Sequence, residues 1–341
     1  MSRKLASIVT VENLSPIAEA DLIEVATVKG WKVVVKKNEF KAGDLAIYCE
    51  IDSFMPVREE FEFLRKSSFR KMRDIEGFRL KTIKLRGQVS QGLLLPMNLL
   101  GGCPYQLGDD VTEHLGIIKY EPPIPASLVG VAKGPFPSFI PKTDEERIQN
   151  LSEQFASLKT HRYYVSEKLD GSSVTYYWHK GQFGVCSRNL ELVEAPDNTL
   201  WKFAYENEIS EKLASLGRAI ALQGELIGEG IQGNPYKLAG QTVRFFYAFD
   251  IGNHQYLPMD EFIQLMERLE LETVPVLAGN FQLPDTIDEI LALADGVAEL
   301  SSPNKPVARE GLVFRNADRT ISFKAISNRF LLKDNNSWVT D

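Results

Sequence analysis

A lysine, an aspartate and a glycine stand close together near the middle of the chain, in the stretch Glu167-Lys168-Leu169-Asp170-Gly171. The preceding residues, 161–165, are mostly aromatic or apolar, as is typical of a β-strand, and Gly171 with two serines then turns the chain. The lysine is therefore predicted to lie at a strand end beside an acid, where the glycine lets the backbone approach a ligand. Such a lysine becomes a nucleophile once its amine is uncharged. Taken alone, the same residues also fit a surface lysine before a turn.

Residues further along the chain could supply the other groups that a reactive lysine needs. The lysine pKa, about 10.4 in free peptides, must be lowered by burial or by nearby cations before the amine can react at neutral pH. Carboxylates suit Mg²⁺ or Mn²⁺, and an aromatic ring offers a stacking face for a base. The candidates are Arg188 and Glu225 for ribose and phosphates, Phe249 for stacking, Glu310 and Asp170 for a metal ion, and Lys324 for the cation. Alone, each acid also fits the surface, and Phe249 fits the core.

The composition sets limits on the class of protein. A length of 341 residues allows one large domain or two ordinary ones. A net charge of −7 gives no sign of nucleic-acid binding, so any such surface must be local. The three scattered cysteines favour a reducing compartment, without a disulfide framework or a zinc site. The chain start does not resemble a signal peptide, and no apolar run reaches the roughly 18 residues of a membrane span. A cytoplasmic or nuclear protein without a membrane partner is expected.

Residues 1–97 are rich in strand signals separated by turn residues, which predicts a small barrel of about five strands, with an OB-like fold as first choice. Nine cations between residues 65 and 86 reverse the overall sign of charge locally. An outward basic row would suit binding to a nucleic-acid backbone, although charge alone fits a solvated strand face equally well. Alternation after Lys81 predicts Ile83 and Leu85 pointing inward and Thr82, Lys84 and Arg86 pointing outward.

Residues 98–141 are rich in proline and glycine and predict a stiff, extended connection. Thr143, with Glu146 three residues later, predicts a capping box that opens a helix from Asp144 through Ser157. Strands and helices alternate after Lys168. The expected elements there are a hairpin around Lys180-Gly181, a helix over 198–216, and amphipathic helices over 259–271 and 285–300.

The pattern Lys-x-Asp-Gly resembles the nucleotide-binding signature of covalent nucleotidyltransferases, which include ATP-dependent DNA ligases, RNA ligases and capping enzymes. DNA ligases and capping enzymes carry an OB domain after the last motif, whereas the extra barrel here is upstream and only residues 327–341 follow Lys324-Ala325-Ile326. Three longer stretches, 81–93, 225–234 and 322–328, closely resemble the Deinococcus-type family of nick-sealing RNA ligases.

This resemblance implies an α+β chain with an OB-like nucleic-acid-binding domain (1–97), a connection (98–141) and a nucleotidyltransferase domain of antiparallel sheets with flanking helices (142–341). It implies an RNA-repair ligase that uses ATP with Mg²⁺ or Mn²⁺ and joins 3′-OH RNA ends to 5′-phosphates at nicks in RNA or RNA/DNA duplexes, through a lysyl-AMP intermediate. Lys168 would be the adenylated nucleophile. The nucleotide would contact Glu167, Lys168, Asp170, Arg188, Glu225, Phe249 and Lys324, the metal would lie near Glu310 and Asp170, and nucleic acid would contact Lys81, Lys84 and Arg86.

The last motif departs from the wider superfamily. Many ligases carry Lys-x-Lys there, and this chain has the single Lys324, which leaves the second cation to Arg315, Arg319 or Lys305. Two other functions stay open. One is a capping-type guanylyltransferase, which labelling with GTP rather than ATP would reveal. The other is a non-catalytic OB-based RNA-binding protein with a degenerate transferase domain. The sequence argues against this second alternative, because it retains all four polar motif residues, Lys168, Glu225, Glu310 and Lys324.

Overall fold

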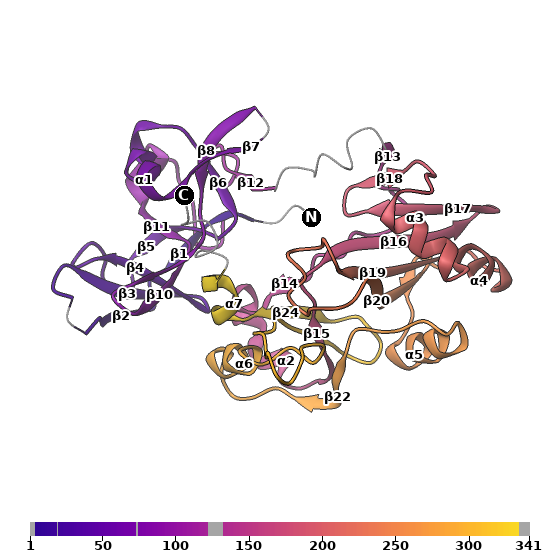
Figure 1. The fold of residues 1–341 in the computed structure, drawn as a ribbon. Coiled ribbons are helices and arrows are strands. Elements are labelled where there is room, and N and C mark those ends of the chain that lie inside the picture. Colours follow the sequence, from indigo (N-terminus) through magenta and orange to yellow (C-terminus); the bar gives the residue numbers. More distant parts are fainter. Residues whose placement is uncertain (1–3, 19, 73, 122–131, 334–341) are drawn as a thin grey trace. The chain divides into compact units, whose positions relative to one another are not determined.

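The computed structural model describes residues 4–18, 20–72, 74–121 and 132–333, and the chain divides into two compact units (Figure 1). The first unit comprises Met1–Ile124, Gln149–Glu153 and Leu331–Asp341, and the second comprises Pro125–Ile148 and Gln154–Phe330. Short segments that follow the start of the second unit in the sequence therefore return to the first unit. Residues 122–131 of the predicted connection, and Arg73 of the cation cluster, lie outside the described residues.

The first unit is built from short antiparallel strands, as its alternating apolar runs predicted. Its sheets have the strand orders β1-β5-β11, β2-β3-β4, β9-β10 and β12-β6-β8-β7. Short 3₁₀ helices span Glu59–Leu64 and Met97–Leu100, and α1 spans Arg65–Ser68. The strands are β1 Ala6–Thr10, β2 Asn13–Pro16, β3 Ile23–Val28, β4 Trp31–Lys36, β5 Leu45–Cys49, β6 Ser53–Pro56, β7 Phe69–Met72, β8 Ile75–Arg79, β9 Thr82–Leu85, β10 Gln88–Gln91, β11 Leu93–Pro96 and β12 Ile118–Lys119.

The core of the first unit consists of two apolar clusters. Successive residues of β1 enter different clusters, Ile8 with Phe78 and Val9 with Trp31, because neighbouring side chains of a strand point to opposite faces. Residues beyond 97 also contribute, since Val111 and Leu115 are buried in the cluster of Ile8. The hydrophobic core of this unit therefore draws on residues that the sequence assigned to the connection.

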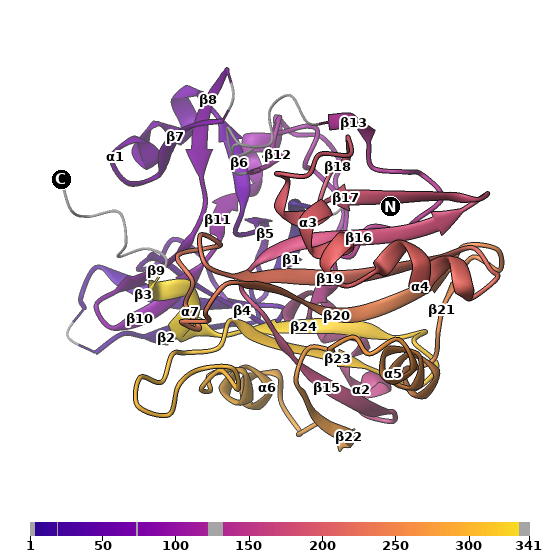
Figure 2. The ribbon, with the colours of Figure 1, turned by 45° about the vertical axis from the view of Figure 1, so that its right-hand side comes forward.

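The second unit contains a seven-stranded sheet, β13-β18-β17-β16-β19-β20-β21, and a five-stranded sheet, β14-β24-β23-β15-β22 (Figure 2). All pairings within these sheets are antiparallel except β14 with β24. The strands are β13 Ala132–Pro135, β14 Glu146–Arg147, β15 Arg162–Lys168, β16 Ser172–His179, β17 Gln182–Ser187, β18 Leu190–Leu192, β19 Ile220–Gly228, β20 Gln241–Asp250, β21 Gln255–Tyr256, β22 Val276–Gln282, β23 Gly311–Arg315 and β24 Ser322–Ile326. The helices are α2 Phe155–Leu158, α3 Thr199–Glu206, α4 Ile209–Ser215, α5 Met259–Arg268 and α6 Ile287–Ala294, and α7 Asn328–Lys333 crosses the boundary between the units.

Local turn chemistry explains several of these elements. The predicted hairpin of β16 and β17 is confirmed, and Lys180 and Gly181 both have positive φ, as a two-residue hairpin turn requires. The helix predicted over 198–216 is two helices instead of one. Asn198 caps α3 by accepting hydrogen bonds from backbone amides, and Glu208, at a φ of 52°, adopts the left-handed conformation that separates α3 from α4. None of the helices that the structure describes is long and apolar enough to cross a membrane.

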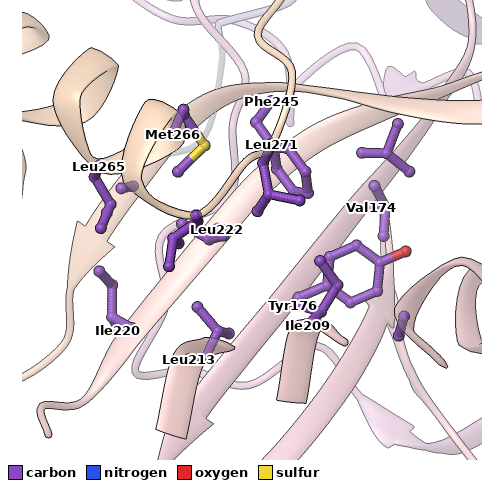
Figure 3. Close-up of a cluster of buried hydrophobic side chains, with 14 of the residues drawn as sticks. Val174, Tyr176, Ile209, Leu213, Ile220, Leu222, Phe245, Leu265, Met266 and Leu271 are labelled. Atoms are coloured by element: carbon purple, nitrogen blue, oxygen red, sulfur yellow. The ribbon is translucent and has the colours of Figure 1, made fainter. Parts of the chain in front are cut away.

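One face of the seven-stranded sheet is covered by helices. Figure 3 shows side chains of the sheet converging with those of α4 and α5. Tyr176 of β16, Leu222 of β19 and Phe245 of β20 are buried against Leu213 of α4 and Met266 of α5. This large apolar cluster stabilises the sheet that positions two candidate site residues. Glu225 lies on β19, and Arg188 directly follows β17.

The other face of the same sheet is covered by residues 134–142, which we call the strap. Ile140 of the strap is buried beside Tyr177 and Phe249, and the Phe139 ring stacks on His179 with a centroid separation of 4.5 Å. The Gln223 side chain donates a hydrogen bond of 2.9 Å to the Pro141 carbonyl. The proline-rich strap is thus packed onto the sheet, where it encloses a second apolar cluster.

The helix predicted from Asp144 through Ser157 is wrong. Glu146–Arg147 forms the short strand β14, a 3₁₀ segment follows over Ile148–Gln154, and only Phe155–Leu158 is α-helical. The acidic residues expected in a first helical turn form tertiary ion pairs instead, Asp144 with Lys324 and Glu145 with Arg315. These pairs, together with the pairing of β14 to β24, outweigh the local capping signal.

Candidate active site

Lys168 is the last residue of β15, at the end of a strand that lies between β22 and β23 in the five-stranded sheet. It is in register with Gly311, which places Glu310 next to it at the start of β23. The Lys168 ammonium lies 2.7 Å from the Glu310 carboxylate, and both side chains are largely buried. Strand pairing therefore brings together two residues that are far apart in the sequence.

Gly171 allows the loop after Lys168 to pass close to β19. A Cβ at this position would lie 2.3 Å from the Leu226 carbonyl oxygen and 2.8 Å from the Glu225 Cγ, so only glycine fits. The Asp170 amide donates a hydrogen bond of 2.7 Å to the Tyr236 hydroxyl, which fixes the same loop. The close approach predicted for this glycine is thus made to the neighbouring strand, and it brings Glu225 to the lysine.

The carboxylates around Lys168 dominate its electrostatics. Burial alone would lower the pKa of Lys168, but the charges of Glu310, Glu225 and Asp170 outweigh it and raise that pKa above its usual value. The protein charges alone therefore do not lower the lysine pKa, and the expected lowering would need the positive charge of a bound metal ion as well. Burial, together with the neighbouring acids Glu310 and Asp170, raises the pKa of Glu225 to about 8, although Lys168 opposes this. A further cation would reduce the electrostatic repulsion among these closely spaced carboxylates.

Lys324 lies on β24, where its ammonium is 2.9 Å from an Asp144 carboxylate oxygen. Its pKa is lowered, first by burial and then by the positive charges of Arg147 and Lys168, although Asp144 opposes the shift. Arg147 is in register with Lys324 in the parallel pairing of β14 and β24, and it is buried. Sequence reasoning missed Arg147, because it lies inside the predicted helix and no motif marks it.

The cations suggested from the sequence as partners of Lys324 lie elsewhere. Arg315 is buried and donates a hydrogen bond of 2.6 Å to the Ser166 hydroxyl, and Arg319 donates to the Phe246 carbonyl. Lys305 is exposed in the segment before β23. Among the described residues, Arg147 is the cation that strand pairing sets directly opposite Lys324.

Glu167 points to the opposite side of β15 from Lys168, as alternation along a strand requires. It is only 1% exposed, and one carboxylate oxygen accepts a hydrogen bond of 2.8 Å from the Glu299 amide. Its other oxygen, Oε1, has no hydrogen-bond partner within the part of the chain that the structure describes. Burial raises the pKa of Glu167, although the hydrogen bond from the Glu299 amide and the charge of Arg309 both oppose the shift. An orphaned acceptor of this kind is suited to a donor on a ligand.

The structure does not expose the ring of Phe249, the residue predicted to stack on a base. Its ring is 2% exposed and lies in the apolar cluster beneath the strap, in contact with Tyr256. The register of β19 and β20 shifts between Gln223 and Gly224, so that Phe246 is an extra, bulged residue of β20. Phe246 is half-buried and packs on the cluster that contains Leu169, next to the candidate nucleophile.

Arg188 follows β17 directly and is exposed. Its positive charge acts to lower the pKa of Glu225, which places it within electrostatic reach of the carboxylates around Lys168. The neighbouring residue, Asn189, is held to the strap, because its side-chain oxygen accepts a hydrogen bond of 2.9 Å from Lys142. The structure thus brings Glu225, Glu310 and Asp170 together around Lys168, with Arg188 within electrostatic reach of Glu225.

The basic row belongs to the first unit, at the hairpin of β9 and β10. Lys84 and Arg86 are exposed there, and Lys81 is half-buried. The predicted alternation is wrong, since Thr82 is 3% exposed while Ile83 and Leu85 are 43% and 39% exposed. Thr82 accepts a hydrogen bond of 3.3 Å from the buried Gln91 side chain. Among the strands that the structure describes, β9 pairs only with β10, in a sheet of two strands, and Ile83 and Leu85 in this strand remain exposed.

The described residues contain no group of three or more histidine, cysteine, aspartate or glutamate side chains arranged to hold a metal ion. Asp170, Glu225 and Glu310 are nevertheless hard oxygen donors that all act on the charge of Lys168. Mg²⁺ is commonly held by one or two carboxylates together with waters and substrate phosphates, so a full protein cage is not required. The donor set therefore fits a divalent metal that binds together with a phosphate substrate.

Comparisons with known proteins agree with this geometry. A family model described as RNA ligase matches residues 161–333, and one described as an OB-fold domain matches residues 5–97. Among solved structures, an aspartate-to-alanine variant of Naegleria gruberi RNA ligase is 46% identical, with a TM-score of 0.91 over 98% of this chain and 99% of that one. The same ligase with pyrophosphate has a TM-score of 0.91 over 98% and 100% of the two chains, at 46% identity.

A lysine-to-alanine variant of that ligase, solved with ATP and manganese, is also 46% identical, with a TM-score of 0.90 over 96% of this chain and 98% of that one. A search of curated protein sequences found no match. The predicted α+β class is confirmed, with an OB-fold domain followed by a transferase domain of antiparallel sheets and helices.

Proposed function

This chain belongs to the RNA ligase family, and from that premise we propose that it is an ATP-dependent ligase of the Deinococcus type that joins 3′-OH RNA ends to 5′-phosphate ends at nicks in duplexes. The observation that carries the proposal is the position of Lys168, held 2.7 Å from Glu310 and surrounded by Glu225 and Asp170. Structures of the related Naegleria gruberi ligase with ATP and manganese, with AMP and manganese, and with pyrophosphate support ATP as the substrate.

In the first step, the uncharged Lys168 amine attacks the α-phosphorus of ATP. A nitrogen–phosphorus bond forms, the bond from that phosphorus to the bridging oxygen breaks, and pyrophosphate leaves while the amine loses its proton. Lys324 and Arg147 provide positive charge for the phosphates, and Arg188 and Glu225 hold the ribose and phosphates. A divalent metal at Glu310 and Asp170 would offset the carboxylate charges that keep Lys168 protonated.

The remaining steps transfer the AMP and join the strands. The 5′-phosphate at the break attacks the lysyl-AMP phosphorus, which releases Lys168 and forms a 5′–5′ pyrophosphate linkage. The neighbouring 3′-OH then attacks the phosphorus that came from the 5′-phosphate of the adenylated strand. The phosphodiester forms, the bond from this phosphorus to the oxygen shared with AMP breaks, and AMP leaves. In all three steps the protein acts by positioning groups and by stabilising charge.

The adenine is assigned to the side of β15 opposite Lys168. Glu167 Oε1, which lacks a partner among the described residues, would accept a hydrogen bond from the adenine amino group, and Phe246 would supply the stacking face. Tyr236 packs in the same cluster as Leu169, and its hydroxyl accepts a hydrogen bond of 2.7 Å from the Asp170 amide.

We predict that Phe246→Ala and Phe249→Ala will have different effects. Loss of the Phe246 ring should raise the ATP concentration for half-maximal self-adenylation about tenfold, the equivalent of one stacking contact of about 1.4 kcal/mol. Loss of the buried Phe249 ring should instead lower the free energy of unfolding by about 3–5 kcal/mol. Labelling at varied ATP and chemical denaturation measure the two quantities. An unchanged ATP dependence in Phe246→Ala would remove this residue from the nucleotide site.

We assign nucleic-acid binding to the first unit, through the basic residues at the β9–β10 hairpin, and nucleotidyl transfer to the second unit. Neutralising Lys81, Lys84 and Arg86 together should leave lysyl-AMP formation nearly intact, because that step needs only ATP, metal and the second unit. Sealing of a nick, and of a pre-adenylated nick, should fall in parallel, and the remaining binding should depend less steeply on salt. A triple variant that seals a pre-adenylated nick normally but cannot adenylate itself would contradict this assignment.

The proposed function is tested with labelled nucleotide and defined nicks. With α-labelled ATP and manganese the protein should become covalently labelled. α-Labelled GTP should give no label, which would exclude a capping-type guanylyltransferase. A nick whose terminal 3′ nucleotides are RNA should be sealed far better than an all-DNA nick, because recognition of the 2′-OH distinguishes the two. Labelling by GTP alone, or equal sealing of both nicks, would contradict the proposal.

A further inference from the structure

A buried polar cluster in the second unit takes no part in the chemistry described above. The Tyr247 hydroxyl donates a hydrogen bond to the Glu145 carboxylate, and the Arg315 guanidinium lies 3.4 Å from the same oxygen. Arg315 also donates a hydrogen bond of 2.6 Å to the Ser166 hydroxyl. Its guanidinium carbon is 4.5 Å from the centre of the Tyr247 ring, and that of Arg319 is 3.9 Å from the same ring. One carboxylate is therefore held by a tyrosine and an arginine, with a second arginine against the tyrosine ring.

The members of this cluster come from four separate parts of the chain. Tyr247 lies on β20, Arg315 is the last residue of β23, and Ser166 lies on β15 two residues before Lys168. Glu145 lies in the short segment that leads from the strap to β14. The cluster thus ties this segment to both sheets of the second unit.

The segment that Glu145 anchors carries two groups that act on Lys324. Asp144 precedes Glu145 and pairs with the Lys324 ammonium at 2.9 Å, and Arg147 follows it in register with Lys324. The segment has little regular structure of its own, because β14 is only two residues long. Besides the pairing of β14 with β24 and the ion pair of Asp144, the contacts of the Glu145 side chain are what hold this segment beside Lys324.

The charge on Glu145 is suited to this anchoring. Burial alone would raise the pKa of Glu145, but Arg315, the Tyr247 hydroxyl and Lys324 outweigh it, so that the pKa lies below its ordinary value. The carboxylate is thus ionised at neutral pH and can hold the guanidinium of Arg315 as a charge-assisted pair.

We propose that Glu145, Tyr247 and Arg315 are positioning residues, which fix Asp144 and Arg147 beside Lys324. Arg147 and Lys324 then form a prearranged cationic site for the outer phosphates of a nucleoside triphosphate. This inference rests on the proposed function. It assigns the cluster to the step that uses ATP and not to the sealing of an end that already carries AMP, since that substrate has no triphosphate.

The sharpest test is Tyr247→Phe, which removes one hydroxyl and keeps the ring that contacts both arginines. Its matched control is Tyr176→Phe, because Tyr176 also donates a buried hydroxyl, at 2.9 Å to the Leu200 carbonyl, in the helix-covered core. For each full-length variant we would measure lysyl-AMP formation against ATP concentration, sealing of a pre-adenylated nick, and the midpoint of unfolding.

Tyr247→Phe should raise the ATP concentration for half-maximal labelling about tenfold and leave sealing of the pre-adenylated nick within about twofold, as expected for loss of one hydrogen bond to a charged group. Tyr176→Phe should leave the ATP dependence unchanged. Glu145→Gln, which keeps an oxygen for the Tyr247 hydroxyl, should retain more affinity for ATP than Glu145→Ala.

Three results would overturn the inference. These are an unchanged ATP dependence in Tyr247→Phe, an equal change in Tyr176→Phe, or a parallel loss of both steps that follows the loss of stability. The wild-type protein separates this inference from the proposed function. Absence of labelling in the wild type contradicts the function itself, whereas normal wild-type labelling with an unchanged Tyr247→Phe contradicts only the positioning role.

Discussion

Lys168→Arg will leave the protein folded and unable to form a covalent adduct with AMP, and Lys168→Ala will behave in the same way. Arginine keeps the positive charge beside Glu310, so the ion pair of 2.7 Å can be replaced by a similar one. A guanidinium cannot be deprotonated near neutral pH, and so it cannot attack the α-phosphorus. Labelling with α-labelled ATP and mapping of the labelled peptide measure this effect, and both variants should be at background.

The chemical stability of the label provides the control for this prediction. A phosphoramidate on Lys168 is lost in acid, whereas a phosphoester on Ser172 or Ser173 would survive the same treatment. Sealing of a pre-adenylated nick tests whether the variants remain competent, since that reaction needs no new lysyl-AMP. Full labelling of Lys168→Ala, or AMP mapped to any other residue, would refute the central claim.

Glu310→Ala and Lys324→Ala should each lower the rate of self-adenylation by at least about 100-fold, the effect expected when one electrostatic group is removed from an active site. Glu310 is the carboxylate in contact with Lys168, and Lys324 is a buried cation whose pKa responds to the charge on Lys168. The two variants should differ in stability, because Glu310→Ala leaves the Lys168 ammonium partly buried without its closest partner. Single-turnover labelling at saturating ATP and manganese measures the rate.

Glu206→Ala is the matched control, because Glu206 is an acid at the end of α3 whose pair with Lys202 is exposed and long, at 3.8 Å. It should adenylate at the wild-type rate and unfold with nearly wild-type stability. If all three variants lost labelling together with folding, the roles assigned to Glu310 and Lys324 would be unsupported.

Sequence reasoning succeeded where the deciding interactions are local. The turn at Lys180-Gly181 and the strand that ends at Lys168 are set by neighbouring residues, and both are present in the structure. The motif residues and the longer stretches around them led to the prediction of an RNA ligase, and the match of an RNA ligase family model over residues 161–333 confirms that broader family. The structure then places Glu225 and Glu310 beside Lys168, through strand pairings that the sequence does not show directly.

The places where the structure differs from the predictions share one physical cause, which is that tertiary contacts overrode a local pattern. Phe249 and Phe246 lie on the same aromatic strand, and a bulge opposite Gln223 and Gly224 decides which of them packs on the cluster that contains Leu169. The segment from Asp144 has a capping signal, but its acids pair with Lys324 and Arg315 instead of capping a helix. Arg147 could not be found, since its only signal is a strand partner 177 positions later that the structure alone reveals.

The return of Gln149–Glu153 to the first unit has a consequence for how the protein can be divided. Within that unit the Asn150 side chain accepts a 2.7 Å hydrogen bond from the Trp31 indole and donates one of 2.7 Å to Glu50, and the Gln149 carbonyl accepts one from the Gly30 amide. A cut anywhere between residues 124 and 149 therefore removes a piece of one unit along with the other. Neither part of a chain cut once in this region contains a whole unit. A first unit truncated in this way is expected to lose Asn150, the hydrogen-bond acceptor of the buried Trp31 indole.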